Sequence, residues 1–186
     1  LTLIAGDPGV GKSFLSLFMA ATVSTGGTWP DSPIGENRES TIENLCSCGS
    51  VMILNNEDSP SRVICPRLSS LNANLSKIKT IPFVWHKDKN GNEFSDYFNI
   101  ITDLRALDMT LSEMPDTKLI IIDPLIAFFG NLGTHKGSYA RAILNPLADL
   151  ARKYNVAIVG VMHLNKGVST KAIYRTMGSV AFPASA

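Results

Sequence analysis

The sequence has no excess of charge of either sign. Its 17 lysines and arginines face 16 acidic residues, which leaves a net charge of +1 at pH 7. A strongly basic chain would have indicated nucleic acid or an anionic membrane as a partner. The balance removes that general argument, so a DNA-binding surface on this chain must be local or assembled from several subunits.

The sequence also lacks long apolar runs and paired cysteines. None of its apolar runs reaches the length of a membrane span, and no segment has the pattern of a cleavable signal peptide. Its three cysteines, Cys46, Cys48 and Cys65, form no C-x-x-C pair. Zinc held by Cys46, Cys48 and His86 fits no standard spacing, and reduced thiols are the better interpretation. We therefore expect a cytoplasmic protein that neither spans nor binds a membrane.

What remains is an ordinary globular composition. The chain has 186 residues, of which 45% are hydrophobic and 18% charged, enough for one α/β domain with a sizeable core. An apolar run begins at its first residue, and the chain stops soon after a motif. We therefore expect residues 1–186 to be a single domain excised from a longer protein.

The most informative stretch is Gly6-Asp-Pro-Gly-Val-Gly-Lys-Ser13, a full match to the phosphate-binding pattern G-x-x-x-x-G-K-[ST]. It lies between an apolar run at residues 1–5 and an apolar stretch at 14–23, so a strand leads into the loop and a helix follows. Glycines let the backbone approach a phosphate, and the helix N-terminus adds N–H groups and positive potential. The lysine supplies a charge for the β- and γ-phosphates of ATP, and the serine hydroxyl a ligand for Mg²⁺. The expected cofactor-binding residues are Gly6, Asp7, Pro8, Gly9, Val10, Gly11, Lys12 and Ser13.

Strands alternate with helices along the rest of the chain. Apolar runs predict strands at residues 1–5, 51–54, 81–85, 118–123 and 156–162. Periodic apolar positions predict helices from residue 59, over 100–114 and over 138–154, with distortions at Pro66 and Pro146. Residues 24–50 and 86–96 have the composition of loops. This order predicts an α/β fold with a mostly parallel central sheet, helices on both faces, and functional residues at the carboxyl ends of strands.

Two strand ends carry carboxylates suited to ATP hydrolysis. Asp123 follows four apolar residues, the usual form of the second nucleotide motif, whose carboxylate holds Mg²⁺ through water. Many ATPases place a catalytic glutamate directly after it, but here Pro124 follows. The group that orients or deprotonates the attacking water must then come from elsewhere. Glu57, beyond the strand at 51–54, is the favoured candidate, and Asp58 is its competitor.

One histidine and several cations complete the candidate set. His163 follows the strand at 156–162, where a polar group could sense the γ-phosphate or simply be a histidine satisfied at a strand end. A cation supplied to a neighbour's site accelerates phosphoryl transfer strongly, and the candidates are Arg62, Arg67, Arg141, Lys166, Lys171 and Arg175. GTP is disfavoured because Val168 stands where the guanine-reading motif N-K-x-D has its aspartate, and residues 123–126 lack the glycine of D-x-x-G.

Taken in order, these motifs resemble RecA-like ATPases of the RepA type, the hexameric replicative helicases of plasmids and phages. The segments that carry the resemblance are GDPGVGKS, NNED with SPSRVICPRL, LIIIDPLIAFFG, YARAILNPLADLARKYNVAIVGVMHLNKG and YRTMGS. The resemblance implies a RecA core in which the strand at 156–162 lies between those at 1–5 and 118–123. The strand at 51–54 would follow, with 81–85 at the edge.

The same resemblance implies roles for single residues. Glu57 would be the catalytic base, Asp123 the Mg²⁺ carboxylate and His163 the sensor. Gly178 and Ser179 would lie toward the central channel of a ring, with Arg175 near a subunit boundary.

Two classes of function follow from this reading. The first is a ring-shaped homo-oligomer, expected to be a hexamer, that couples ATP hydrolysis to movement on single-stranded DNA as a helicase. The second is a regulatory ATPase that switches assembly or partner binding without translocation. The absence of clustered basic residues favours the second class, while the resemblance favours the first. A small-molecule kinase is a weaker third reading because no arginine-rich lid is evident.

Overall fold

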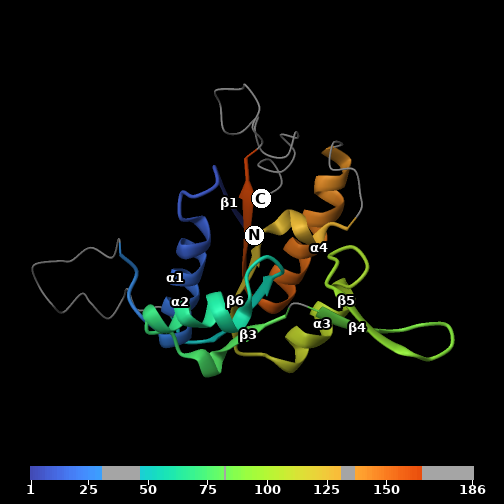
Figure 1. Ribbon diagram of the computed structural model, residues 1–186, viewed down its shortest axis with the longest axis horizontal. Helices are drawn as coiled ribbons and strands as arrows, with labels where there is room; N and C mark the ends of the chain where they lie inside the picture. Colours follow the sequence, from blue (N-terminus) through green and yellow to red (C-terminus); the bar gives the residue numbers. More distant parts are fainter. Residues whose placement is uncertain (31–46, 82, 131–136, 165–186) are drawn as a thin grey trace, which may run out of the picture.

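The computed structural model describes residues 1–30, 47–81, 83–130 and 137–164 (Figure 1). Its centre is a parallel sheet of five strands in the order β1-β7-β6-β2-β3. The strands are β1 (Thr2–Gly6), β7 (Ala157–His163), β6 (Thr117–Asp123), β2 (Ser50–Asn55) and β3 (Ile78–Thr80). The predicted α/β fold is confirmed, and so is the expected order of the first four strands.

Helices cover both faces of the sheet (Figure 1). Successive side chains of β2 and β6 point to opposite faces, so each strand contributes to two apolar cores. One core joins the sheet to α1 (Lys12–Thr25) and α2 (Cys65–Ser70) and contains Leu17, Ala20, Val51, Ile53, Leu68, Leu119 and Ile121. The other joins it to α3 (Leu104–Glu113) and α4 (Gly137–Tyr154) and contains Met52, Leu54, Leu107, Leu111, Ile120, Ile122 and Leu147. None of the helices in the described ranges is long and apolar enough to cross a membrane.

The edge strand differs from the prediction. Residues 78–80, not 81–85, form β3, and Ile81 makes one further bond when its N–H donates to the carbonyl oxygen of Ile53 at 2.9 Å. The chain then leaves the sheet and forms a separate antiparallel hairpin of β4 (Phe83–Lys87) and β5 (Glu93–Tyr97). Residues 86–96, predicted to be a loop, are therefore largely strand.

A tight turn explains the hairpin. One oxygen of Asp88 accepts the N–H groups of Asn90 and Asn92 at 2.8 Å each, and Gly91 takes φ +84°, which favours glycine. The main-chain N–H of Asp88 also donates to the carbonyl oxygen of Asn92 at 2.9 Å. The asparagines and glycine that gave this segment a loop-like composition are the residues that reverse the chain.

Two predicted helices also differ in detail. The helix from residue 59 is capped by Ser59, which accepts the Arg62 N–H at 3.4 Å, as its Ser-Pro start predicts. It begins with a π-helical turn, η2 (Pro60–Ile64), and becomes α-helical in α2 just before Pro66. α3 begins at Leu104, four residues later than predicted, and Ile100 is buried in the preceding turn. Two 3₁₀ turns complete the elements of the described residues: η3 (Leu75–Lys77) and η4 (Leu125–Phe128).

Candidate nucleotide-binding site

The phosphate loop connects the end of β1 to the start of α1. Gly9 and Gly11 have φ of +82° and +88°, in the left-handed region that favours glycine. A β-carbon at Gly6 would lie 3.2 Å from the Val10 side chain, so a larger residue here would require that side chain to shift. The first helical bond runs from the Leu15 N–H to the Gly11 carbonyl at 2.9 Å. The amides before Leu15 therefore have no partner within the helix and are available to an anion.

Lys12 is the buried member of an exposed loop. Residues 7–11 are exposed, whereas Lys12 is 7% exposed. Its Nζ donates to the carbonyl oxygens of Gly6 at 2.9 Å and Asp7 at 2.8 Å. An ammonium has three donors, so this arrangement leaves one for a further acceptor at the loop. The Gly6 and Asp7 carbonyl groups thus hold the lysine ammonium against the backbone of the phosphate loop.

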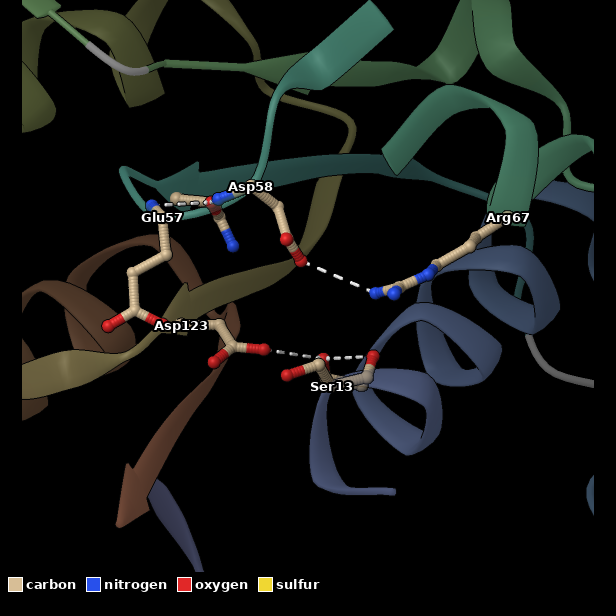
Figure 2. Close-up of polar contacts among 7 residues, drawn as sticks. Ser13, Glu57, Asp58, Arg67 and Asp123 are labelled. Carbon is tan, nitrogen blue, oxygen red and sulfur yellow. Dashed lines mark hydrogen bonds and ion pairs between the residues drawn. The ribbon is translucent and has the colours of Figure 1, made fainter. Parts of the chain in front are cut away.

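Asp123 connects the second motif to the first. Asn55 is paired with Asp123 and Gly6 with His163, so these strand ends share one edge of the sheet. Ser16 Oγ donates to the carbonyl oxygen of Ser13 at 3.0 Å and lies 3.5 Å from Asp123 Oδ2 (Figure 2). Ser16 was missed in the sequence analysis. Its signal was a small hydroxyl residue one helical turn after Ser13, within the mostly apolar stretch at residues 14–23.

Burial dominates the electrostatics of Asp123. This side chain is 5% exposed, and burial raises the pKa of its carboxyl group above the ordinary value. Hydrogen bonds from the Ser13 and Ser16 hydroxyls and the charge of His163 oppose that rise, while the negative charge of Asp58 adds to it. A buried carboxylate beside a serine hydroxyl is a set of hard oxygen donors that fits Mg²⁺.

This pair is not a complete metal cage. Among the described residues, no group of three or more His, Cys, Asp and Glu side chains gathers as a metal site. Mg²⁺ in nucleotide sites is commonly held by one or two protein oxygens together with phosphates and water. The residues present therefore fit an ion that arrives with a nucleotide.

Glu57 and Asp58 occupy one turn at the end of β2 but differ in their partners. Asn55 Oδ1 accepts the N–H groups of Glu57 at 3.0 Å and Asp58 at 2.7 Å, which fixes the turn. Asp58 Oδ2 forms an ion pair with Arg67 Nη1 at 3.3 Å. The Glu57 carboxylate is exposed, and within the described part of the chain no hydrogen bond or ion pair engages it. In Figure 2 the Glu57 side chain extends to the side where Asp123 lies, whereas Asp58 turns toward Arg67.

His163 ends β7 next to the phosphate loop. It is half-buried, and its Nδ1 is a buried atom with no hydrogen-bond partner among the described residues. A positive charge on His163 lowers the pKa of the Asp123 carboxyl group. The structure thus places His163 between the two nucleotide motifs with one ring nitrogen available.

The structure brings none of the other described candidate residues into contact with the phosphate loop or Asp123. Arg62 and Arg141 are exposed, and Arg67 is bound to Asp58 of its own chain. Lys166, Lys171, Arg175, Gly178 and Ser179 lie outside the described residues, as does Cys46. The other two cysteines, Cys48 and Cys65, are free thiols. His86 lies in β4, where its Nε2 is 3.8 Å from Asp103 Oδ1.

Comparison with known proteins assigns the chain to a family. A family model described as an AAA domain matches residues 1–169, which include the phosphate loop, Glu57, Asp123 and His163. No curated protein matches the chain.

Proposed function

The chain belongs to the AAA domain family and is a nucleotide-hydrolysing ATPase of that type, and we propose that it is the motor of a ring-shaped DNA helicase of the RepA type. In this proposal the protein hydrolyses ATP with Mg²⁺ and assembles with further copies of itself into a hexamer. The hexamer would move along single-stranded DNA. The observation that carries the ATPase part is the contact of Asp123 with the Ser13–Ser16 turn, because it joins the two nucleotide motifs at one sheet edge.

Each residue of the site has a distinct task in this proposal. The loop amides and Lys12 Nζ bind the β- and γ-phosphates, and Lys12 would exchange its carbonyl acceptors for phosphate oxygens. Ser13 and Asp123 would hold Mg²⁺, which neutralises charge on the phosphates when bound. His163, with a buried ring nitrogen that lacks a partner, would sense the γ-phosphate.

The attacking water requires a base, and we assign this role to Glu57. Asp58 is already paired with Arg67, while the Glu57 carboxylate has no competing partner among the described residues. In the reaction a water oxygen bonds to the γ-phosphorus, its proton passes to Glu57, and the bond from the γ-phosphorus to the bridging oxygen breaks.

Steady-state ATP hydrolysis by the full-length protein, with and without single-stranded DNA, tests the proposal. Lys12→Ala should abolish hydrolysis because the loop then loses its only ammonium, and Lys79→Ala, an exposed lysine on β3, is the matched control. Turnover by Lys12→Ala equal to that of the native protein would refute the site. Stimulation by DNA of about tenfold would support a DNA motor, since catalysis then depends on the track.

The alternative is a regulatory ATPase that does not translocate, and the absence of clustered basic residues in the sequence is the observation that favours it. Robust hydrolysis that is indifferent to single-stranded DNA would support this alternative. Proteins retained by the ATP-bound but not the ADP-bound protein would then be sought.

A further inference from the structure

The β4–β5 hairpin turns one of its two faces toward the rest of the domain. His86 and Phe94 are paired across the hairpin, and because side chains alternate along a strand they lie on the face opposite to Trp85. His86 Nε2 lies 3.8 Å from Asp103 Oδ1, so this face looks toward the start of α3. Figure 1 shows the hairpin beside α3.

A cleft of about 610 Å³ lies between this face of the hairpin, the start of α3 and the end of η4. Its volume is in the range of sites that hold small molecules. The side chains and glycine that border it include His86, Phe94, Asp96, Asn99, Asp103 and Gly130. The residues of the nucleotide site are not among those that line the cleft, so the two sites are distinct.

Asp103 brings a buried negative charge to the cleft. Its side chain is 5% exposed and occupies the N-cap position of α3, yet it accepts no capping bond from the helix. Oδ2 accepts the Asn99 N–H at 2.8 Å, and Oδ1 accepts the Thr102 hydroxyl at 3.0 Å. Both donors are neutral, and no lysine or arginine in the described ranges forms an ion pair with this carboxylate. A buried carboxylate is costly unless a cation neutralises it, so the arrangement favours a positively charged ligand.

The other charges of the cleft point the same way. Asp96 and Asp103 contribute −1 each, and the described residues that line the cleft include neither lysine nor arginine. Arg105 is close to Asp103 in sequence but borders a different cleft, between α3 and α4. A bare metal ion is a poor fit, because the described residues contain no group of three or more His, Cys, Asp and Glu side chains that could hold one.

An aromatic wall accompanies the carboxylates. Phe94 is 47% exposed although its face of the hairpin turns toward the domain, because it borders the cleft. Its ring is stacked on His86, with ring centroids 5.4 Å apart. Aromatic rings attract organic cations and pack against their carbon skeletons. The wall therefore favours a cation with an apolar body.

We infer that this cleft binds a small organic cation, whose ammonium group pairs with Asp103 and whose apolar body packs against Phe94. A carboxylate offers about four acceptor positions, and the two bonds to Asn99 and Thr102 leave room for a charge-assisted bond from the ligand. The site is independent of the proposed ATPase activity.

A ligand-observed NMR titration of the full-length protein with phenethylammonium chloride tests the site. We expect a dissociation constant on the order of a millimolar or lower, which is ordinary for a fragment of this size. The neutral analogue 2-phenylethanol has the same ring and chain and should bind at least about tenfold more weakly, because it cannot neutralise Asp103. This comparison uses the native protein and requires no variant.

Variants locate the bound ammonium group. Asp103→Asn should weaken binding of phenethylammonium by about tenfold or more. Glu113→Gln is the matched control, because it removes an exposed carboxylate at the other end of α3. His86→Lys should abolish binding, since the new ammonium would pair with Asp103 in place of the ligand, whereas His86→Gln should retain it. Lys12→Ala should bind the probe as the native protein does.

Three results would overturn the inference. Equal affinities for phenethylammonium and 2-phenylethanol would show that the cleft does not select charge. A folded Asp103→Asn variant with native affinity would remove the carboxylate from the site, and if that variant fails to fold, native affinity in His86→Lys would do the same. Loss of the probe in Lys12→Ala, or its displacement by MgADP, would assign binding to the phosphate loop. A protein that binds the probe but does not hydrolyse ATP would refute only the proposed function.

Discussion

At the scale of single residues, the site depends on how each carboxylate is partnered. Lys12, Ser13 and Asp123 could be located from spacing alone because their motifs tie them to a strand end and a helix start. The contact of Ser16 with Asp123 and the Asp58–Arg67 pair could not, since nothing in the sequence states which polar side chains meet across 107 or 9 residues. The choice between Glu57 and Asp58 as base depends on that pair.

The base assignment leads to a first comparison of variants. Glu57→Gln should keep ATP binding and lower turnover by roughly a thousandfold, the scale lost when a key catalytic group is removed. Asp58→Asn should cost much less, because Asp58 is engaged with Arg67. Turnover and the dissociation constant for a fluorescent ATP analogue distinguish the two variants. The reverse ranking would move the role of base to Asp58.

The buried carboxylate of Asp123 should oppose folding while it serves function. Its pKa is raised above 3.8 by burial, so the folded protein binds this proton more tightly than the unfolded chain. The stability contributed by this group is therefore highest at low pH and falls as the pH rises from 3.8 through the raised pKa. Asp123→Asn should be more stable than the native protein at pH 7 in EDTA, with a difference that shrinks toward pH 4.

Urea unfolding at several pH values measures this difference, and Mg²⁺ with ADP provides its control. The ligand should stabilise the native protein by binding its folded state, and should stabilise Asp123→Asn less. If Asp123→Asn is less stable than the native protein at pH 7 without metal, burial is not the cause of the raised pKa of Asp123.

At the scale of elements, the central strands were predictable and the hairpin was not. Runs such as residues 118–123 contain enough branched apolar residues to form strands buried on both faces. The β5 strand, Glu93-Phe-Ser-Asp-Tyr97, has no buried face, so its apolar pattern indicates nothing until its partner is known. The Asn90-Gly91 turn was the available signal, as asparagine before glycine favours a hairpin. α3 began later than its apolar period indicated because a buried residue such as Ile100 need not be helical.

Packing between elements gives a prediction for Gly160 in β7. A β-carbon there would lie 3.0 Å from both Leu3 on β1 and Leu125 in η4. Gly160→Val should therefore destabilise the fold by about 1–3 kcal/mol, the usual cost of overpacking a core. Ala157→Val, at an exposed position on the same strand, should cost little. Equal midpoints of urea unfolding for the two variants would contradict this prediction, because Leu3 and Leu125 would then accommodate the larger side chain.

At the scale of the whole molecule, the sequence predicts more about the nucleotide site than about the partner. The motifs sufficed for the fold class because a phosphate loop, a buried strand ending in aspartate and alternating helices occur together in one architecture. Partner surfaces are different, since side chains become neighbours on a surface only after folding.

Assembly should be visible in the kinetics. If a neighbour completes the active site, ATPase rate per subunit should rise with protein concentration and level off once rings have formed. Phosphate release measured over a dilution series of the protein would give this rate per subunit. Sedimentation at the same concentrations would give the oligomeric state for comparison. A constant rate per subunit in a protein shown to be monomeric would exclude a contribution from a second copy.

The position of β7 has a consequence for synthesis. In the described sheet β1 is bonded to β7 alone, and β7 separates it from β6, although β7 follows both along the chain. A nascent chain therefore carries its phosphate loop and Asp123 long before the strand between them exists. Residues 157–163 must be synthesised before β1 can join the sheet, so the complete nucleotide site should form late in translation.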